Sequence, residues 1–213
     1  MKKSIVLGII ALVAGVATSY SQGFITLDNY STYGAGGADP AVVYGTGVFA
    51  NGVSGTLGIA GAPVSLNDWT VGLYFVGGTV ALTDPGSGTI PISPLALGTG
   101  TGATIPMGAE NGGSVAGYFG ATHSFNTGVA AGSTVTLEVV VYDTAAGSYA
   151  SALYRGHSAP FSMATVAVTS PTPTYAGDFM PGQISVQAVP EPTTLALAGL
   201  GGLALLAFRR KQA

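Results

Sequence analysis

The stretch that decides the fold class is TVTLEVVVY, residues Thr134–Tyr142. Aliphatic side chains recur there at every second position from Val135 to Val141. Successive side chains of a β-strand point to opposite faces, so this spacing predicts a strand whose aliphatic face meets the core. The other face is mixed and carries Glu138, and we expect it to be partly in contact with water.

Short segments of the same character occur along the chain between positions 22 and 189. They are rich in β-branched and aromatic residues and are separated by Gly, Pro, Asn or Asp, a pattern typical of strands joined by turns. The pattern predicts an all-β fold, an antiparallel β-sandwich of which a jelly roll is one version, with a barrel as the alternative. The further predicted strands are Phe24–Asp28, Val42–Phe49, Trp69–Val76, Val115–Phe119, Phe161–Val168 and Gln183–Val189.

The connections between these strands contain one segment with helical signals and two that are rich in glycine. Asp143 or Thr144 is placed to cap Ala145–Tyr154, which we expect to form either a short helix or a structured loop. Glycine recurs in Ser31–Ala38 and Leu97–Gly113, and we expect both to be exposed, mobile loops.

Composition excludes several classes of protein. Charged residues make up 7% of the 213 residues, against a usual share of about 25%, and there is no Cys for a disulfide, a thiol nucleophile or a Cys-ligated metal. Arg155 is the only Lys or Arg between Gln22 and Val189, where one base and eight acids give a formal charge of −7. An acidic body repels phosphate backbones, which argues against a nucleic-acid partner.

The N-terminal residues 1–21 have the three parts of a secretory signal peptide. Lys2 and Lys3 precede the uncharged apolar stretch Ile5–Val16, and small residues follow as far as Ser21. The apolar stretch has 12 residues, fewer than the roughly 20 needed to span a bilayer. We therefore expect cleavage after Ser21, with cleavage after Ser19 as the alternative, and export of the remaining chain. The competing interpretation is an uncleaved N-terminal anchor.

The C-terminal residues form a second composite signal. An apolar run of 16 residues would give a helix of about 24 Å, which is short for a hydrocarbon core of about 30 Å and suits a transient anchor. A basic cluster at its end indicates a cytoplasmic end. The parts are, in order, Pro190-Glu191-Pro192, the apolar segment Thr193–Phe208 as a predicted transmembrane helix, and Arg209-Arg210-Lys211.

These three parts closely resemble the PEP-CTERM sorting signal of Gram-negative bacteria, over roughly residues 189–211. The resemblance implies that an exosortase, a membrane-embedded cysteine protease, processes the chain near Pro190–Pro192 during export. It also implies partners in the secretion machinery, membrane contact before processing, and an association with exopolysaccharide and biofilm matrix. The chain would then consist of a signal peptide (1–21), a β-sandwich body (22–188) and a sorting segment (189–213). The alternative is an ordinary C-terminal membrane anchor.

Aromatic residues of the body supply the main binding hypothesis. Tyr and Trp combine an apolar ring with a polar tip, so an exposed row on one sheet face can stack on sugar rings. The candidates are Trp69, Tyr74, Tyr118 and Tyr142. Packing of the same rings in the core or at a sheet edge is the competing interpretation.

Patterns for catalysis and cofactor binding are weak. Gly156–Pro160 reads GHSAP, which lacks the last Gly and the strand-to-helix order of a nucleophile elbow. Gly98–Ala103 is followed by Pro106 rather than by an amphipathic helix, as a dinucleotide site would need. We expect no catalytic residues and no cofactor. Structural calcium is the milder alternative, with loop carboxylates at Asp39, Asp84, Asp143 and Asp178.

The sequence therefore predicts an exported, non-catalytic protein of the cell surface or extracellular matrix with a structural or adhesive role. The alternative is a carbohydrate-binding module acting on exopolysaccharide, and an exported hydrolase is the third interpretation. In each case transient anchoring in the inner membrane would precede the final location at the surface or outside the cell.

Overall fold

The computed structural model of the protein describes most of the body. The described residues are 22–30, 41–48, 58–65, 68–86, 88–91, 93–108, 115–167 and 174–189. The predicted signal peptide, the loop Ser31–Ala38, and residues 190–213 with the predicted transmembrane helix lie outside these ranges. Within them, no helix combines the length and the apolar character that crossing a membrane requires.

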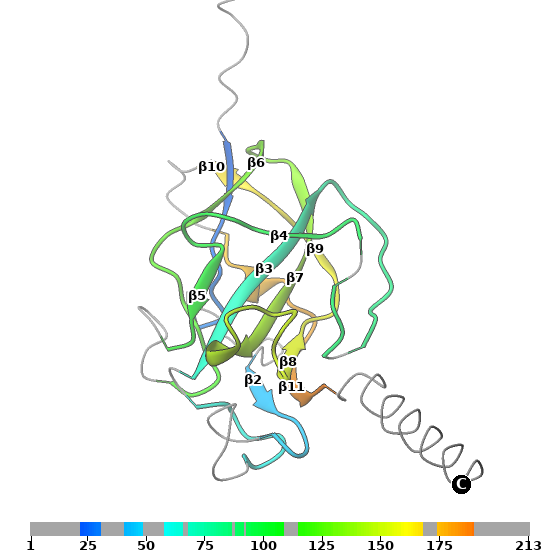
Figure 1. Ribbon diagram of the computed structural model, residues 1–213. Helices are drawn as coiled ribbons and strands as arrows, with labels where there is room; N and C mark the ends of the chain where they lie inside the picture. Colours follow the sequence, from blue (N-terminus) through cyan, green and yellow to red (C-terminus); the bar gives the residue numbers. More distant parts are fainter. Residues whose placement is uncertain are drawn as a thin grey trace, which may run out of the picture.

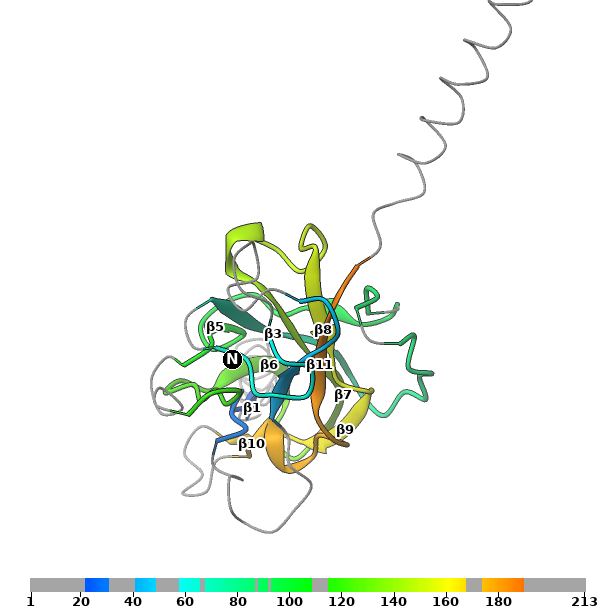
Figure 2. The same cartoon turned by 90° about the horizontal axis from the view of Figure 1, so that it is seen from below.

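Two β-sheets make up the described body, as Figures 1 and 2 show from two directions. One sheet has the order β10-β1-β6, and the other has the order β2-β11-β8-β7-β3-β4, with β5 also beside β3 and β9 also beside β7. The bounds are β1 Gln22–Ile25, β2 Val42–Tyr44, β3 Trp69–Gly77, β4 Ala96–Leu97, β5 Thr104–Pro106, β6 Phe125–Ala130, β7 Thr134–Asp143, β8 Tyr154–His157, β9 Phe161–Ala164, β10 Val166–Ala167 and β11 Ile184–Ala188.

The longest pairing in the larger sheet joins β3 and β7, which run side by side through the centre of Figure 1. The antiparallel register is unbroken from Trp69 opposite Asp143 to Gly77 opposite Val135. Both strands alternate apolar residues toward the smaller sheet, so their inner faces form one continuous surface. The segment TVTLEVVVY thus forms the strand that its spacing predicts.

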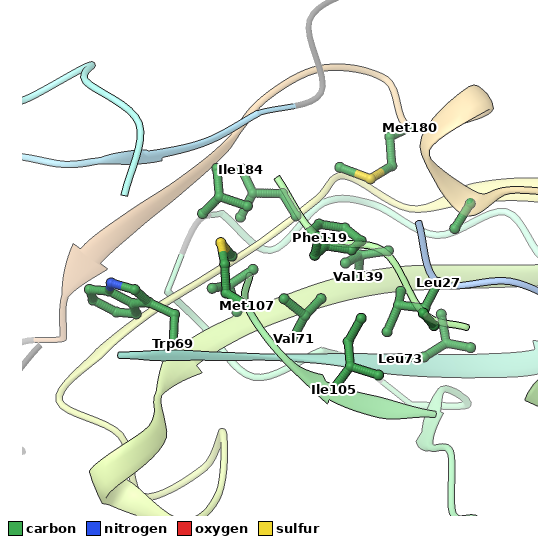
Figure 3. Packing of buried hydrophobic residues seen from close by; sticks show 14 of the residues in the cluster. Leu27, Trp69, Val71, Leu73, Ile105, Met107, Phe119, Val139, Met180 and Ile184 are labelled. Atoms are coloured by element: carbon green, nitrogen blue, oxygen red, sulfur yellow. The ribbon is translucent and has the colours of Figure 1, made fainter. Parts of the chain in front are cut away.

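The core lies between the two sheets and is apolar. Phe125 of β6 packs edge-on against Phe75 of β3, with ring centroids 5.2 Å apart. Trp69 is fully buried and lies edge-on to the ring of Tyr44 at 6.2 Å. Figure 3 shows how side chains from separate elements meet in this layer: Leu27, Trp69, Val71, Leu73, Ile105, Met107, Phe119, Val139, Met180 and Ile184.

The all-β sandwich is confirmed, with one difference in strand direction. β2 and β11 pair in parallel, from Val42 opposite Ile184 to Tyr44 opposite Val186, whereas the other strand pairs within the described sheets are antiparallel. A parallel pair needs a long crossover, and most of the described body lies between β2 and β11 in sequence.

Several predicted elements are corrected by the structure. Val115–Phe119 is a turn and not a strand, with Gly117 at a φ of 81°. Of the two alternatives for Ala145–Tyr154, the chain takes the structured loop, which opens with a 3-10 helix η1 (Thr144–Ala146) and enters β8 at Tyr154. A second 3-10 helix, η2, spans Ala176–Asp178. The strands missed by the sequence analysis are β4, β5, β6 and β8.

Candidate functional site

The outer face of β7, which points away from the core, is buried. Glu138 and Val140 are fully buried and Tyr142 nearly so, which means that the predicted contact of this face with water is wrong. The connection from β3, residues 78–91 without residue 87, crosses this face and is called the strap below. Its first turn is fixed by Thr136, whose Oγ1 donates to the carbonyl of Gly78 at 2.9 Å and accepts from the N–H of Val80 at 2.8 Å.

Arg155, the only Lys or Arg between Gln22 and Val189, makes hydrogen bonds to both segments that cover this face, the strap and the loop after η1. Its Nε donates to the strap carbonyl of Gly88 at 2.6 Å, and its Nη1 donates to the carbonyls of Tyr149 at 2.8 Å and Ala150 at 2.7 Å. The guanidinium carbon lies 5.2 Å from the centre of the Tyr149 ring, and the Tyr149 hydroxyl donates to the strap carbonyl of Thr89 at 2.6 Å. A buried charge is tolerated because backbone dipoles and a ring surround it.

His157 makes a second connection between sheet and strap. Its Nε2 lies 2.7 Å from the carbonyl oxygen of Gly86, and its Nδ1 lies 2.8 Å from the carbonyl oxygen of Ser158. The contact with Gly86 joins the strap to β8. The carboxyl group of Glu138 lies beside the ring, with its Oε2 3.7 Å from Nδ1.

Glu138 is the least satisfied polar group of this cluster. Neither carboxyl oxygen has a hydrogen-bond partner among the residues that the structure describes. Desolvation by burial raises the pKa of Glu138 to about 7; the charge of His157 opposes this rise, and Asp84 adds to it. Because of this raised pKa, the carboxyl group holds its proton up to near-neutral pH.

A cavity of about 210 Å³ lies beside the cluster and is lined by Asp84, His157 and residues 181–183 among others.

A larger hollow of about 490 Å³ lies where the body passes into residues 190–213. It is lined by residues 88–90 of the strap, by Arg155 and by Gln187–Val189 at the end of β11, and is called the β11 groove below. Ile90 is about half exposed at this groove.

The aromatic residues proposed for sugar stacking do not form an exposed row, which corrects that hypothesis. Trp69 belongs to the core, and Tyr118 and Tyr142 are buried. Tyr74 is partly exposed, and its ring packs edge-on against Tyr149 at 6.1 Å. The competing interpretation, packing within the fold, describes all four rings better.

The other candidate groups are engaged in backbone contacts. The Ser158 hydroxyl of the GHSAP segment accepts from the N–H of Val139 at 3.0 Å. The carboxylates of Asp84 and Asp143 each accept from a backbone N–H two residues ahead, at Gly86 (2.8 Å) and Ala145 (2.9 Å). Across the described ranges no three His, Asp or Glu side chains gather as a metal site would require, and Asp39 lies outside these ranges.

The cluster of Glu138, Arg155 and His157 was not foreseen from the sequence. Arg155 and His157 stand two positions apart, so they share one face of a strand, but the sequence predicts no strand between Tyr142 and Phe161. The alternation of Tyr154, Arg155, Gly156 and His157 was the available signal, and it is too short to predict a strand on its own.

Comparison with known proteins addresses the sorting segment. The family model described as the PEP-CTERM protein-sorting motif matches residues 188–211 and confirms the resemblance seen in the sequence. No curated protein and no solved structure is detectably similar to the chain. The motif implies an exported protein with an exosortase as its processing partner. The chain is therefore a protein that carries the PEP-CTERM sorting signal.

Proposed function

We propose that this protein is a non-catalytic component of the cell surface or extracellular matrix, delivered there by its sorting signal. The observation that carries the proposal is the match of residues 188–211 to the PEP-CTERM motif, directly after the last strand of a folded β-sandwich. The signal peptide 1–21 starts export, Thr193–Phe208 holds the chain in the inner membrane for a time, and cleavage near Pro190–Pro192 frees the body.

The body supports a structural role. The groups best suited to chemistry are Arg155, His157 and Ser158, and each is buried and hydrogen-bonded to the backbone. An active site needs groups that face a substrate, whereas these groups hold the strap and the strands together. A low-charge β-sandwich held in this way is suited to persist outside the cell, in contact with exopolysaccharide or with other copies of itself.

The first test is the intact mass of the protein recovered from its native host, together with both terminal sequences. We expect loss of residues 1–21 and a new C-terminus near Pro190–Pro192. Replacement of Arg209 and Arg210 by Gln should leave the C-terminal segment uncleaved, with the N-terminus still processed. A wild-type protein that retains Arg209-Arg210-Lys211 would contradict sorting and release, and would indicate a simple anchored domain.

The second test separates a matrix component from a carbohydrate-binding module. The processed body is incubated with the host's purified exopolysaccharide and, separately, with the whole matrix fraction. A matrix component should sediment with the matrix without saturating at one defined oligosaccharide site. Saturable binding of one oligosaccharide, competed by that sugar alone, would favour the module.

A further inference from the structure

Exposed apolar side chains lie at the end of the body where β11 finishes. Ile90 lines the β11 groove together with Val189 and is about half exposed. Leu153 is 57% exposed, and its carbonyl accepts the N–H of Val189 at 2.7 Å, which places it beside the same residue. The β11 groove and Leu153 together are called the exit surface below. Large apolar side chains that gather on a surface are typical of a contact site.

A further exposed apolar side chain lies toward this end, on the β2 side of β11. Gly45 donates its N–H to the carbonyl of Val186 at 2.6 Å, so the chain leaving β2 lies beside the end of β11. The turn that carries Ile59 is bonded to the same place, since Gly61 donates its N–H to the carbonyl of Tyr44 at 2.8 Å. Three of the five large apolar side chains that are exposed in the described ranges therefore lie toward one end of the larger sheet.

The charge of the exit surface suits a partner that carries phosphate. Arg155 is the one charged residue among the described residues that line the β11 groove, and none of them is acidic. Nε and Nη1 of Arg155 are engaged with carbonyls, but Nη2 has no hydrogen-bond partner within the described part of the chain. Guanidinium N–H groups bind phosphate oxygens well, and apolar side chains beside a cation are typical of surfaces that rest on lipid headgroups.

The number of residues after Val189 limits how far the exit surface can stand from a membrane. Four residues lead from Val189 to Thr193, the first residue of the predicted transmembrane helix. Four extended residues span about 14 Å at most. The headgroup layer on each side of the hydrocarbon core is about 5–8 Å thick. While that helix is inserted, the exit surface is therefore held at the headgroups or just above them.

We propose that the exit surface docks on the phospholipid surface while the chain is anchored, with Ile90 and Leu153 in the headgroup layer and Arg155 facing lipid phosphate. This docking rests on the proposed function, because the transient anchor brings the exit surface to the membrane. It holds the body in one orientation next to its own sorting signal. A contact of this size depends on the high effective concentration that the tether gives it, so cleavage near Pro190–Pro192 also ends the docking.

The test measures contact between the exit surface and lipid in the anchored chain. Because the natural chain has no Cys, Gln187→Cys gives a single site in the β11 groove for an environment-sensitive fluorophore. The full chain is exported in a host that lacks an exosortase, purified in detergent, and reconstituted into vesicles of phosphatidylethanolamine and phosphatidylglycerol that contain lipid with a nitroxide on its headgroup. Docking should quench most of the label. Leu153→Ser should lower the ratio of quenched to unquenched label about tenfold, because a leucine side chain returns to water.

Leu97→Ser is the matched control, because it makes the same change at a leucine that is 42% exposed and lies opposite Tyr74 of β3. It should leave the ratio unaltered. Equal ratios in Leu153→Ser and its parent would overturn the docking, and so would an equal loss in Leu97→Ser.

Anchoring is measured separately, by flotation of the vesicles at high pH. A chain that leaves the vesicles would contradict the transient anchor and the docking together. A chain that floats with the vesicles but shows no effect of Leu153→Ser would contradict the docking alone.

Discussion

Leu137 and Glu138 are neighbours on β7 and both are fully buried, but they are covered in different ways. Leu137 faces the core, where the side chains of two sheets interlock. Glu138 faces the other way, beneath a strap and a loop held to the sheet by hydrogen bonds from Arg155, His157 and Thr136. One face of the strand is thus covered by a second sheet and the other by irregular backbone.

The difference shows what it takes to bury the outer face of a sheet under loops. Irregular backbone brings carbonyl groups that must find donors, and the sheet supplies those donors from Arg155 and His157. The apolar core depends on side chains that fit together closely. The outer face depends on side chains that donate hydrogen bonds to the carbonyl groups of its cover. The predictions below test whether the two coverings differ in stability as they differ in chemistry.

The largest effect is expected in a matched pair of truncations on β7. Val139 and Val140 are adjacent and fully buried on opposite faces. Val139→Ala should lower the free energy of unfolding by about 3 kcal/mol, because the packed sheets relax little around a cavity. Val140→Ala should lower it by about 2 kcal/mol, since the strap and loop can partly close the space. Urea unfolding measures both, and a larger loss for Val140→Ala would contradict the comparison.

The donors of the outer face are tested by Arg155→Met, which keeps an apolar stem of similar length. Removing the donors to Gly88, Tyr149 and Ala150 should destabilise the protein by about 2 kcal/mol. Amide exchange should become faster in the strap and in residues 144–153 but stay unchanged in β3. Arg155→Lys keeps the charge, but one ammonium group cannot reach the separated carbonyls together. Its free energy of unfolding should therefore lie between those of the wild type and Arg155→Met. Unchanged exchange in the strap would contradict the assigned role.

The sequence predicts the core face of β7 but misses most of what covers its outer face. The alternation from Val135 to Val141 specifies a strand and its core face, because period two is a local property. The cover of Glu138 comes from a strap more than 45 positions earlier in the chain, and no local pattern reports such a contact. β6 is missed for a related reason. Asn126 and Gly128 occupy the exposed positions of its alternation but have weak strand propensity, for which pairing with β1 compensates.

The buried carboxyl makes stability depend on pH. The pKa of Glu138 is raised from 4.5 to about 7, chiefly by desolvation, with His157 opposing and Asp84 adding to the rise. The folded state therefore keeps a proton that the unfolded chain releases between about pH 4.5 and 7, and the free energy of unfolding should fall as the pH rises through this window.

Glu138→Gln isolates this contribution because it keeps His157 and Asp84 in place. We expect the variant to unfold at nearly the same urea concentration as the wild type at pH 5 and at a higher one at pH 8. Parallel profiles of the two proteins across pH 5–8 would show that the carboxyl group does not titrate in this window.

The smallest effect is expected at the edge of the outer covering. Asp143 caps η1 through a hydrogen bond from the N–H of Ala145 to Oδ1 at 2.9 Å, and Gly147 ends it at a φ of 72°. Asp143→Ala should cost about 1 kcal/mol, and Asp143→Asn, which keeps an acceptor, should cost less. Thermal unfolding with amide exchange at Ala145 measures the loss. Because η1 is a single turn beside the Arg155 contacts, its cap positions the loop without holding the sheet. A loss from Asp143→Ala as large as that from Val139→Ala would mean that loop and core unfold as one unit.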